Sequence, residues 1–273
     1  MHKVMIIGGS DSSGGAGIQA DLKTVTALGV YGTTVITALT AQNTLGVQSI
    51  QSVPPAFVGK QIDSIMNDVG AEAVKTGMLL NDEIVVVVSK KIREYQLDNV
   101  VVDPVLYAKD GSALLAGNDA IKTLISELLP LAVVVTPNIP EAEVLSGVSI
   151  KQPADIKEAA KAIHGLGAKN VLIKGGHAPG DWPSRKKGVV EDLFYDGSNF
   201  RELVSPRADV GSVHGGGCTL ASTVAAGLAR GKTVEEAVLF AKEFLSESMR
   251  CSIKVGRGHN VLDPYDSVRR HSR

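Results

Sequence analysis

The fold of this chain is decided first by the segment Val4-Met5-Ile6-Ile7-Gly8-Gly9-Ser10-Asp11. A short apolar run that ends in paired glycines indicates a buried strand followed by a turn. Beyond the turn, apolar residues recur at the spacing of one helix face, at Ile18, Leu22, Val25 and Leu28. A buried strand followed by an amphipathic helix is the repeating unit of parallel sheets.

The same alternation continues through most of the chain. Further strands are predicted at residues 33–39, 73–76, 100–103, 132–136 and 171–174. Helical periodicity predicts helices around residues 58–69, 84–95, 155–166, 217–229 and 234–249. Such alternation implies right-handed crossovers and a mostly parallel sheet that is covered by helices on both faces.

The alternation of predicted strands and helices changes near residue 189. Two strand-like runs at residues 189–196 and 199–204 flank Gly197-Ser198, which predicts a hairpin. The polar segment 179–188 is expected to be a mobile flap, and the charged tail after Asp263 is expected to fray. With no internal repeat and no linker, residues 1–273 are expected to form a single domain.

Composition narrows the class of protein. Hydrophobic residues make up 44% of the chain but aromatic residues only 4%, so the core must be largely aliphatic. A net charge of −1 gives no bulk attraction for nucleic acid or an anionic membrane, and the apolar runs are too short for a membrane span. Two cysteines and scattered histidines suggest neither a disulfide framework nor a zinc site. We expect a soluble, cytoplasmic protein.

Polar residues follow the predicted strands at the edge where open parallel sheets bind their ligands. They lie at residues 8–11, 40–43, 75–78, 103–104, 136–141 and 174–177. Turns alone place polar residues at strand ends, but the charged Asp103 and Lys174 directly at strand ends are less easily explained in that way.

The strongest single motif is His214-Gly215-Gly216-Gly217-Cys218, which leads into a helical run. A glycine turn that opens a helix directs free N–H groups at one point, and the helix dipole adds positive potential there. Such a site would stabilise charge on a transferred phosphoryl group. The same field is expected to lower the pKa of Cys218, whose thiolate would accept a substrate proton. For this motif alone, a buried structural cysteine is the favoured interpretation.

Two other glycine-rich segments are rejected as phosphate sites. Residues 227–233 are one residue short of a Walker A loop and follow a helix, so they are interpreted as a helix C-cap and the next N-cap. Residues 14–17 hint at a dinucleotide fold, but no acidic residue ends the second strand to hold a ribose.

Taken in order, these motifs resemble those of hydroxymethylpyrimidine/phosphomethylpyrimidine kinases. The matching segments are residues 9–24, 35–44, 75–79, 102–105, 136–142 and 174–177. The resemblance implies a ribokinase-like three-layer α/β/α fold with a small β flap, usually as a homodimer. It also implies ATP- and Mg²⁺-dependent phosphorylation of 4-amino-5-hydroxymethyl-2-methylpyrimidine and then of its monophosphate, in thiamine diphosphate biosynthesis.

The resemblance also implies residue roles. The residues implied to bind the pyrimidine are Gly9, Asp21, Gln42, Met78 and Val105. Asp103 and Glu141 would hold Mg²⁺, directly or through water. The residues implied to act on the phosphates or the reacting hydroxyl are Lys174, Asn138, Gly215, Gly216, Gly217 and, as the base, Cys218. Without the resemblance, Asp21 would be a solvated helix carboxylate, Gln42 a turn residue, Asp103 a strand-end cap and Glu141 a first-turn glutamate.

Several positions depart from the family pattern. Gly216 stands where threonine is usual, and Ser212-Val213 replace the usual Asn-Thr. A related pyridoxal kinase carries a second cysteine where this chain has Ala108, which favours the pyrimidine substrate. Two alternatives stay open: a pyridoxal/pyridoxine kinase, and a non-catalytic pyrimidine-binding relative, which the altered glycine turn supports.

Overall fold

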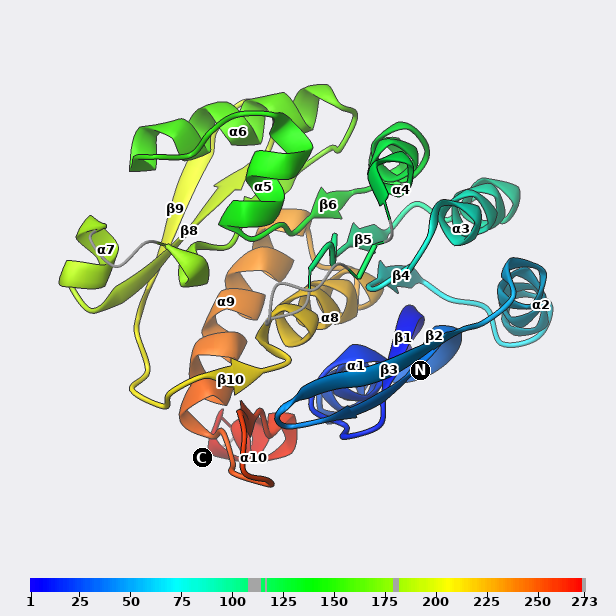
Figure 1. Ribbon diagram of the computed structural model, residues 1–273, viewed down its shortest axis with the longest axis horizontal. Helices are drawn as coiled ribbons and strands as arrows, with labels where there is room; N and C mark the ends of the chain where they lie inside the picture. The colour runs from blue at the N-terminus through cyan, green and yellow to red at the C-terminus, as the bar shows by residue number, and fades with distance from the viewer. Residues whose placement is uncertain (108–113, 116, 179–181, 272–273) are drawn as a thin grey trace.

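A computed structural model describes residues 1–107, 114–115, 117–178 and 182–271 (Figure 1). Within that part of the chain, nine strands form one sheet in the order β3-β2-β1-β4-β5-β6-β7-β8-β9. The strands are β1 (Lys3–Asp11), β2 (Tyr31–Asn43), β3 (Gly46–Ser52), β4 (Ala73–Thr76), β5 (Val100–Val102), β6 (Val134–Val135), β7 (Val171–Ile173), β8 (Val189–Tyr195) and β9 (Phe200–Pro206). A separate pair is formed by β10 (Val213–His214) and β11 (Asn260–Val261).

The long helices follow the strands as the alternation predicts. They are α1 (Gly17–Ala27), α2 (Pro55–Met66), α3 (Asp82–Glu94), α6 (Pro153–Gly165), α8 (Gly216–Ala229) and α9 (Val234–Arg250). Shorter or irregular helices, which were not predicted, are α4 (Gly117–Thr123), η1 (Leu124–Leu128), η2 (Leu129–Leu131), α5 (Ile139–Ser146), η3 (Gly175–His177), α7 (Pro183–Lys186) and α10 (Pro264–His271). Among the described residues, no helix has the length and apolar character needed to cross a bilayer.

The centre of the sheet is parallel, as expected, from β2 through β1, β4, β5 and β6 to β7. Antiparallel partners extend it at both edges, β3 against β2 and the β8–β9 hairpin against β7. The hairpin expected near residue 197 is therefore confirmed, and it continues the central sheet. The β2–β3 hairpin projects beyond the parallel strands as a small flap (Figure 1).

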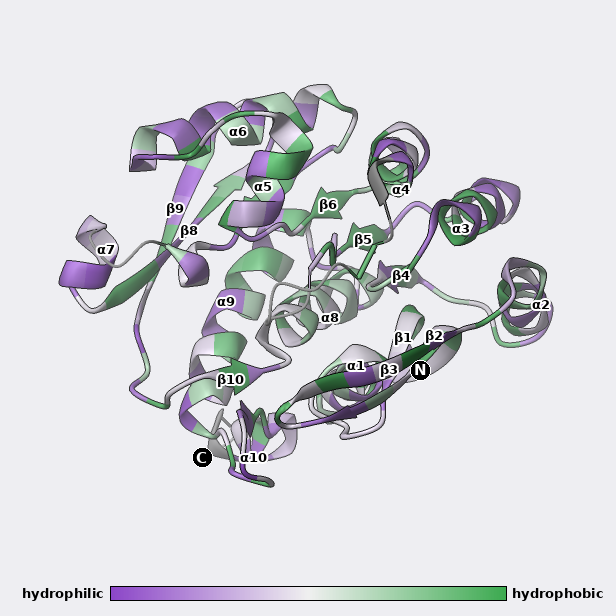
Figure 2. Cartoon of the chain, in the orientation of Figure 1, coloured by the Kyte–Doolittle hydropathy of each residue, from purple (hydrophilic) through white to green (hydrophobic). Residues whose placement is uncertain are grey.

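Two aliphatic cores lie on opposite faces of the sheet. Met5 and Ile7 pack into one core, and Val4 and Ile6 into the other. Because successive residues of a strand point to opposite faces, a strand covered on both sides must be apolar throughout. Helices α2 to α6 cover one face, whereas α1, α8 and α9 cover the other. In Figure 2, β5 and β6 are accordingly green, whereas the outer helices carry both purple and green surfaces.

The junction between α8 and α9 confirms the interpretation of residues 227–233. Helix α8 continues through Gly227, and Gly231 then adopts a left-handed φ of 79°. Thr233 caps α9 in a capping box with Glu236. No backbone loop remains there to surround a phosphate.

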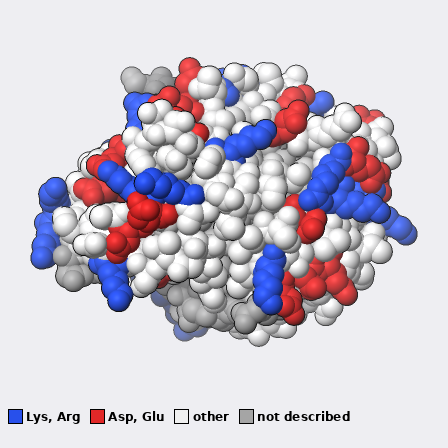
Figure 3. Space-filling model, turned by 90° about the horizontal axis from the view of Figure 1, so that it is seen from above, with Lys and Arg blue, Asp and Glu red and all other residues white. Residues whose placement is uncertain are grey.

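The expectation that the tail after Asp263 frays is wrong for residues 264–271, which form α10. This helix packs beside α1 and α9, and the Asp263 carboxylate accepts from the backbone N–H of Tyr265 at 3.1 Å. Residues 272–273 lie outside the described residues. The expected flap at 179–188 contains α7, whereas residues 179–181, like Ala108, lie outside the described residues. Charges of both signs are interspersed over the face seen in Figure 3, in keeping with the net charge of −1.

Candidate active site

A cavity of about 920 Å³ opens at the carboxyl ends of the parallel strands. The chain leaves β1 toward β2 on one side and returns to β4 on the other, so the strand order reverses there, where α/β sheets bind ligands. The lining includes every site residue predicted from the sequence: Gly9, Asp21, Gln42, Met78, Asp103, Val105, Asn138, Glu141, Lys174, Gly215, Gly216, Gly217 and Cys218. The fold therefore brings together residues as far apart in the sequence as Gly9 and Cys218.

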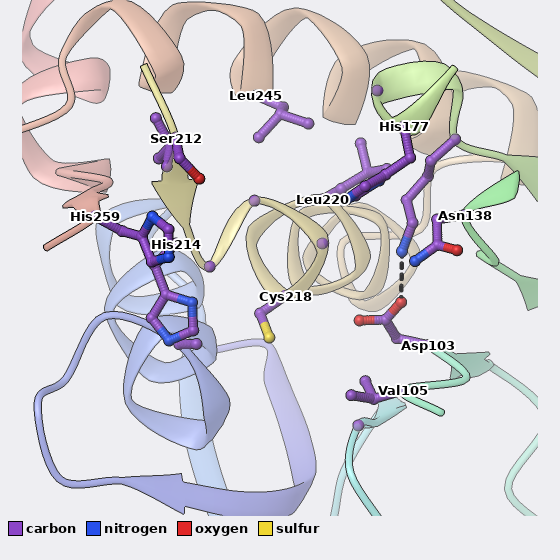
Figure 4. A pocket seen from close by; sticks show the side chains of 18 of the residues that line it. Asp103, Val105, Asn138, His177, Ser212, His214, Cys218, Leu220, Leu245 and His259 are labelled. Carbon is purple, nitrogen blue, oxygen red and sulfur yellow. Dashed lines mark hydrogen bonds and ion pairs between the residues drawn. The ribbon is translucent and has the colours of Figure 1, made fainter. Parts of the chain in front are cut away.

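The glycine turn opens α8 against this cavity, as Figure 4 shows. Gly215 is the N-cap with a φ of 86°, and a Cβ atom there would lie 2.1 Å from the Gly15 carbonyl oxygen. A Cβ atom on Gly217 would lie 3.2 Å from Lys174 Nζ and 3.6 Å from Asp103 Oδ2. The first N–H groups of a 14-residue helix thus lie beside the charged groups of the cavity, which is the arrangement of an anion site.

Asp103 and Lys174 form an ion pair at the strand ends. Lys174 Nζ donates to Asp103 Oδ1 at 2.8 Å (dashed in Figure 4), and Thr136 Oγ1 donates to the same oxygen at 3.1 Å. Burial alone would raise the pKa of Asp103, but the ammonium groups of Lys174 and Lys75 hold it below its usual value. Asp103 is therefore a buried anion, not merely a strand-end cap.

Glu141 and Asn138 cap α5 beside this pair. The Glu141 carboxylate accepts from the backbone N–H of Asn138 at 2.8 Å, and the Asn138 side chain accepts from the N–H of Glu141 at 2.9 Å. Burial raises the pKa of Glu141 to about 7, against the attraction of Lys174. A buried carboxylate of this kind would gain from a nearby cation.

The donor set at this end of the cavity fits Mg²⁺. The side-chain hydrogen bonds described for Asp103 fall on Oδ1, which leaves Oδ2 toward the glycine turn. No cluster of three or more metal-binding side chains occurs among the described residues. Mg²⁺ is commonly held by one or two carboxylates together with water and phosphate oxygens, so Asp103 and Glu141 suffice.

Cys218 lies in the first turn of α8, with its sulfur toward the cavity (Figure 4). Burial raises the pKa of its thiol to about 12, and Lys75 opposes the rise only in part. The expectation of a lowered pKa is therefore wrong for the ligand-free protein. Lys75 and the backbone N–H of Gly17 favour the thiolate, but the loss of water around it outweighs both.

Asp21 is buried in an ion pair that the sequence did not reveal. Its Oδ2 lies 2.8 Å from Lys75 Nζ, and its Oδ1 accepts from Ser222 Oγ at 2.7 Å. Each side chain of the Asp21–Lys75 pair is only 1% exposed, so a solvated helix carboxylate is excluded. Burial alone would lower the pKa of Lys75, but the attraction of Asp21 raises it. The available signal for Lys75 was a charged residue inside a short apolar strand.

Gln42 contacts His214, which in turn contacts Asp11, and neither of these two residues was predicted to act in the site. Its Nε2 lies 2.7 Å from His214 Nε2, and His214 Nε2 lies 3.3 Å from Asp11 Oδ2. His214 belongs to β10 and Asp11 ends β1, so only the folded chain brings them to Gln42. The motif around His214 was recognised, but its contact with β2 leaves no local signal in the sequence.

Comparisons with known proteins agree with this site. The phosphomethylpyrimidine kinase family model matches residues 11–263. "Thiamine biosynthesis bifunctional protein ThiED" of Geobacter sulfurreducens is 49% identical over 260 residues, which cover 95% of this chain and 51% of that protein. This chain thus spans about half the length of that relative. "Hydroxymethylpyrimidine/phosphomethylpyrimidine kinase" of Bacillus subtilis is 42% identical over 265 residues, which cover 97% of this chain and 95% of that protein.

A solved structure shows the same architecture. The ADP complex of Bacillus subtilis pyridoxal kinase has a TM-score of 0.87 at 38% identity, and the match covers 98% of this chain and 99% of that one. The ribokinase-like fold expected from the sequence is confirmed. Because the family model spans most of the sequence and the relatives match nearly all of it, the chain belongs to the phosphomethylpyrimidine kinase family.

Proposed function

We propose that this chain is an ATP-dependent kinase that phosphorylates 4-amino-5-hydroxymethyl-2-methylpyrimidine and then the resulting monophosphate. The observation that carries the proposal is one cavity that joins a phosphate-binding helix start to the Asp103–Lys174 pair and to Gln42. Family membership supports the reaction, and the ADP bound to the pyridoxal kinase supports ATP as phosphate donor.

At the phosphate end, the turn at Gly215–Gly217 would donate backbone N–H groups to the transferred phosphoryl group. Such donors stabilise charge that develops in the transition state. Lys174 would exchange part of its contact with Asp103 for phosphate oxygens, with Asn138 beside it. Asp103 and Glu141 would hold Mg²⁺, which supplies neutralisation of the phosphate charges when bound.

At the pyrimidine end, Gly9, Met78 and Val105 would form the wall against the ring. A Cβ atom on Gly9 would lie 2.4 Å from Met78 Cε, so a glycine here lets the Met78 side chain close the wall. Gln42 supplies the polar group that a heteroaromatic ligand needs for a fixed orientation. Asp21 would act at the base of this wall through its ion pair with Lys75.

Cys218 would accept the proton of the substrate hydroxyl, and for this it must first lose its own. Lys75 and the backbone N–H of Gly17 favour that ionisation, although burial opposes it in the ligand-free protein. A thiolate formed in this setting is strongly basic, so proton transfer from the hydroxyl to sulfur would accompany phosphoryl transfer. Such general base catalysis is worth about 10²- to 10⁴-fold in rate.

A second candidate function is phosphorylation of pyridoxal-type alcohols. It is favoured by the similarity to pyridoxal kinase in fold and sequence. The pyrimidine assignment is favoured by the higher identity, 42% against 38%, to the Bacillus subtilis relative named as a hydroxymethylpyrimidine/phosphomethylpyrimidine kinase. The two substrate classes share the hydroxymethyl group and differ in the ring, so the side of the cavity near Gln42 would separate them.

A coupled assay of ADP release tests the proposal. The substrates are the pyrimidine alcohol, its monophosphate, pyridoxal and pyridoxine, each with saturating ATP and Mg²⁺. We expect turnover of both pyrimidines, with kcat/KM for the alcohol at least tenfold above that for pyridoxal. No turnover of either pyrimidine by well-folded protein would refute the proposal, and preferential turnover of pyridoxal would establish the second candidate.

We further propose that residues 1–273 act as one domain in a cytoplasmic homodimer. The nine-stranded sheet uses strands from Lys3 to Pro206, which supports the single domain. Cys218 and Cys251 form no disulfide, which suits a reducing compartment. Light scattering after size exclusion measures the oligomeric state.

A further inference from the structure

Three polar side chains from separate segments, those of Asp11, Gln42 and His214, lie together at one side of the cavity. Asp11 ends β1, Gln42 lies near the end of β2, and His214 ends β10. The ring atom His214 Nε2 faces both partners, at 3.3 Å from Asp11 Oδ2 and 2.7 Å from Gln42 Nε2. His214 Nε2 thus lies next to both Asp11 and Gln42. Whether it carries a proton decides whether each neighbour acts as a hydrogen-bond donor or acceptor toward it.

Asp11 is a fixed acceptor in this cluster. The side chain is 3% exposed, its Oδ1 accepts from Ser13 N and Oγ, and its Oδ2 accepts from the N–H groups of Gly15 and Ala16. Burial alone would raise the pKa of Asp11, but the hydrogen bonds from His214 and from these donors lower it to about 2. An ionised carboxylate that faces His214 Nε2 requires a proton on that nitrogen. In the neutral ring, His214 is therefore the Nε2–H tautomer.

The amide of Gln42 can present either of its two atoms to His214, since oxygen and nitrogen occupy equivalent positions. With the nitrogen toward His214, two N–H donors would face each other if Nε2 is protonated. On the other side of the amide, Thr40 Oγ1 lies 3.1 Å from the second amide atom and 2.9 Å from the Ser10 carbonyl oxygen. If the amide oxygen faces Thr40, the single hydroxyl proton of Thr40 would have to be donated to both the Gln42 oxygen and the Ser10 carbonyl oxygen.

The opposite orientation satisfies every group. The Gln42 oxygen accepts from His214 Nε2–H, which is shared with Asp11. The Gln42 nitrogen donates to Thr40 Oγ1, and Thr40 donates to the Ser10 carbonyl. One amide N–H then remains for a ligand in the cavity that Gln42 and Thr40 both line. An orientation without conflicting donors is favoured because two N–H donors that face each other repel and leave both groups without an acceptor.

We propose that His214 is a positioning residue that, anchored by Asp11, fixes the Gln42 amide with its NH₂ group toward the substrate. The inference rests on the proposed function in one respect, that the substrate is a pyrimidine. A pyrimidine ring nitrogen accepts a hydrogen bond, so a Gln42 donor fits it, whereas a Gln42 oxygen would repel it. His214 thereby sets selectivity for a ring acceptor through the Gln42 amide.

A double-mutant cycle tests this role. The variants are His214→Leu, Gln42→Ala and the double variant, with KM for the pyrimidine, KM for ATP and kcat measured separately. We expect His214→Leu to raise KM for the pyrimidine roughly tenfold and to change KM for ATP less than twofold. In the Gln42→Ala background the same change should have almost no further effect. Additive effects of the two substitutions would overturn the proposal.

A matched pair of substitutions separates positioning from packing. His214→Gln places a donor where Nε2 now lies and should keep KM near that of the wild type. His214→Asn is equally polar but reaches only as far as Nδ1 and should behave like His214→Leu. His2→Leu, an exposed position outside the cavity, serves as the neutral control. Equal loss in the Gln and Asn variants would contradict the proposal.

The tautomer provides a test that does not depend on turnover. Long-range ¹H–¹⁵N correlation of the ligand-free wild type at pH 8 distinguishes Nε2–H from Nδ1–H in a histidine ring. We expect His214 as the Nε2–H form, and an Nδ1–H ring would overturn the inference. If the wild type does not phosphorylate the pyrimidine, the proposed function fails, while this measurement still decides the arrangement of His214.

Discussion

Cys218 combines a favourable position with an unfavourable environment for ionisation. It lies in the first turn of α8, where N–H groups favour an anion, yet burial raises the pKa of its thiol to about 12. Asp21 and Asp103 add to the rise, while Lys75 opposes it. The ligand-free protein therefore holds Cys218 as a thiol, which protects the sulfur from chance alkylation or oxidation.

This environment predicts slow and pH-dependent alkylation of Cys218. Because only the thiolate reacts, the rate with iodoacetamide should rise about tenfold per pH unit and show no plateau between pH 6.5 and 9.5. Site-resolved mass spectrometry measures the rate at Cys218, with the buried Cys251 followed in the same sample. A plateau below pH 8 would contradict a thiol whose pKa is raised by burial.

At the scale of elements, the start of α8 contains glycines that are not equivalent. Gly215 has a φ of 86° and no room for a Cβ atom beside the Gly15 carbonyl. A Cβ atom on Gly216 would instead meet Met249 Cε at 2.9 Å, the end of a flexible side chain on α9. The turn itself thus requires Gly215, whereas Gly216 is replaceable if Met249 shifts.

This difference predicts that substitutions at Gly215 and at Gly216 have opposite effects. Gly215→Ala should lower the free energy of unfolding by at least about 1 kcal/mol and abolish turnover, because the turn cannot form without strain. Gly216→Thr should fold normally and lower KM for ATP several-fold, since its hydroxyl adds a donor near the phosphates. Gly216→Ala is the control for the added Cβ atom. If it lowers KM as much as threonine does, the hydroxyl is not responsible.

A helix or strand can be predicted from sequence when its packing against neighbouring elements imposes a hydrophobic pattern on its residues. Strands β1, β4 and β5 were predicted well, because burial on both faces makes their central residues largely apolar. Strand β3 was missed, since it is mostly exposed and carries no apolar alternation. The helix α10 was missed because packing on α1 and α9 stabilises it, and this packing cannot be predicted from its charged local sequence.

The site shows the same division. Asp103 and Lys174 stood out because charges at the ends of buried strands are unusual. The roles of Asp21 and Gln42 came only from the resemblance to a family, and the Asp21–Lys75 pair joins α1 to β4 across 54 positions. The contact of His214 with Asp11 and Gln42 depends on tertiary structure alone. Local sequence therefore predicted the phosphate end better than the pyrimidine end.

At the scale of the whole molecule, one cavity must bind both a nucleotide and a small heteroaromatic alcohol. Its walls come from β1 and β2, from the segments that follow β4 to β7, and from α8 and α9, so the N-terminal and the C-terminal parts of the chain both contribute to it. The central claim is that a phosphoryl group crosses this cavity from ATP to the hydroxymethyl oxygen of the pyrimidine.

The most direct test is to identify the phosphorylated product. Wild type and Cys218→Ala are incubated with Mg²⁺, ATP and the pyrimidine alcohol, and the products are followed by ³¹P NMR and mass spectrometry. We predict successive pyrimidine monophosphate and diphosphate from the wild type, and no product from Cys218→Ala, which still binds ATP. ADP formed without a phosphorylated pyrimidine, or near-normal product from Cys218→Ala, would contradict the account.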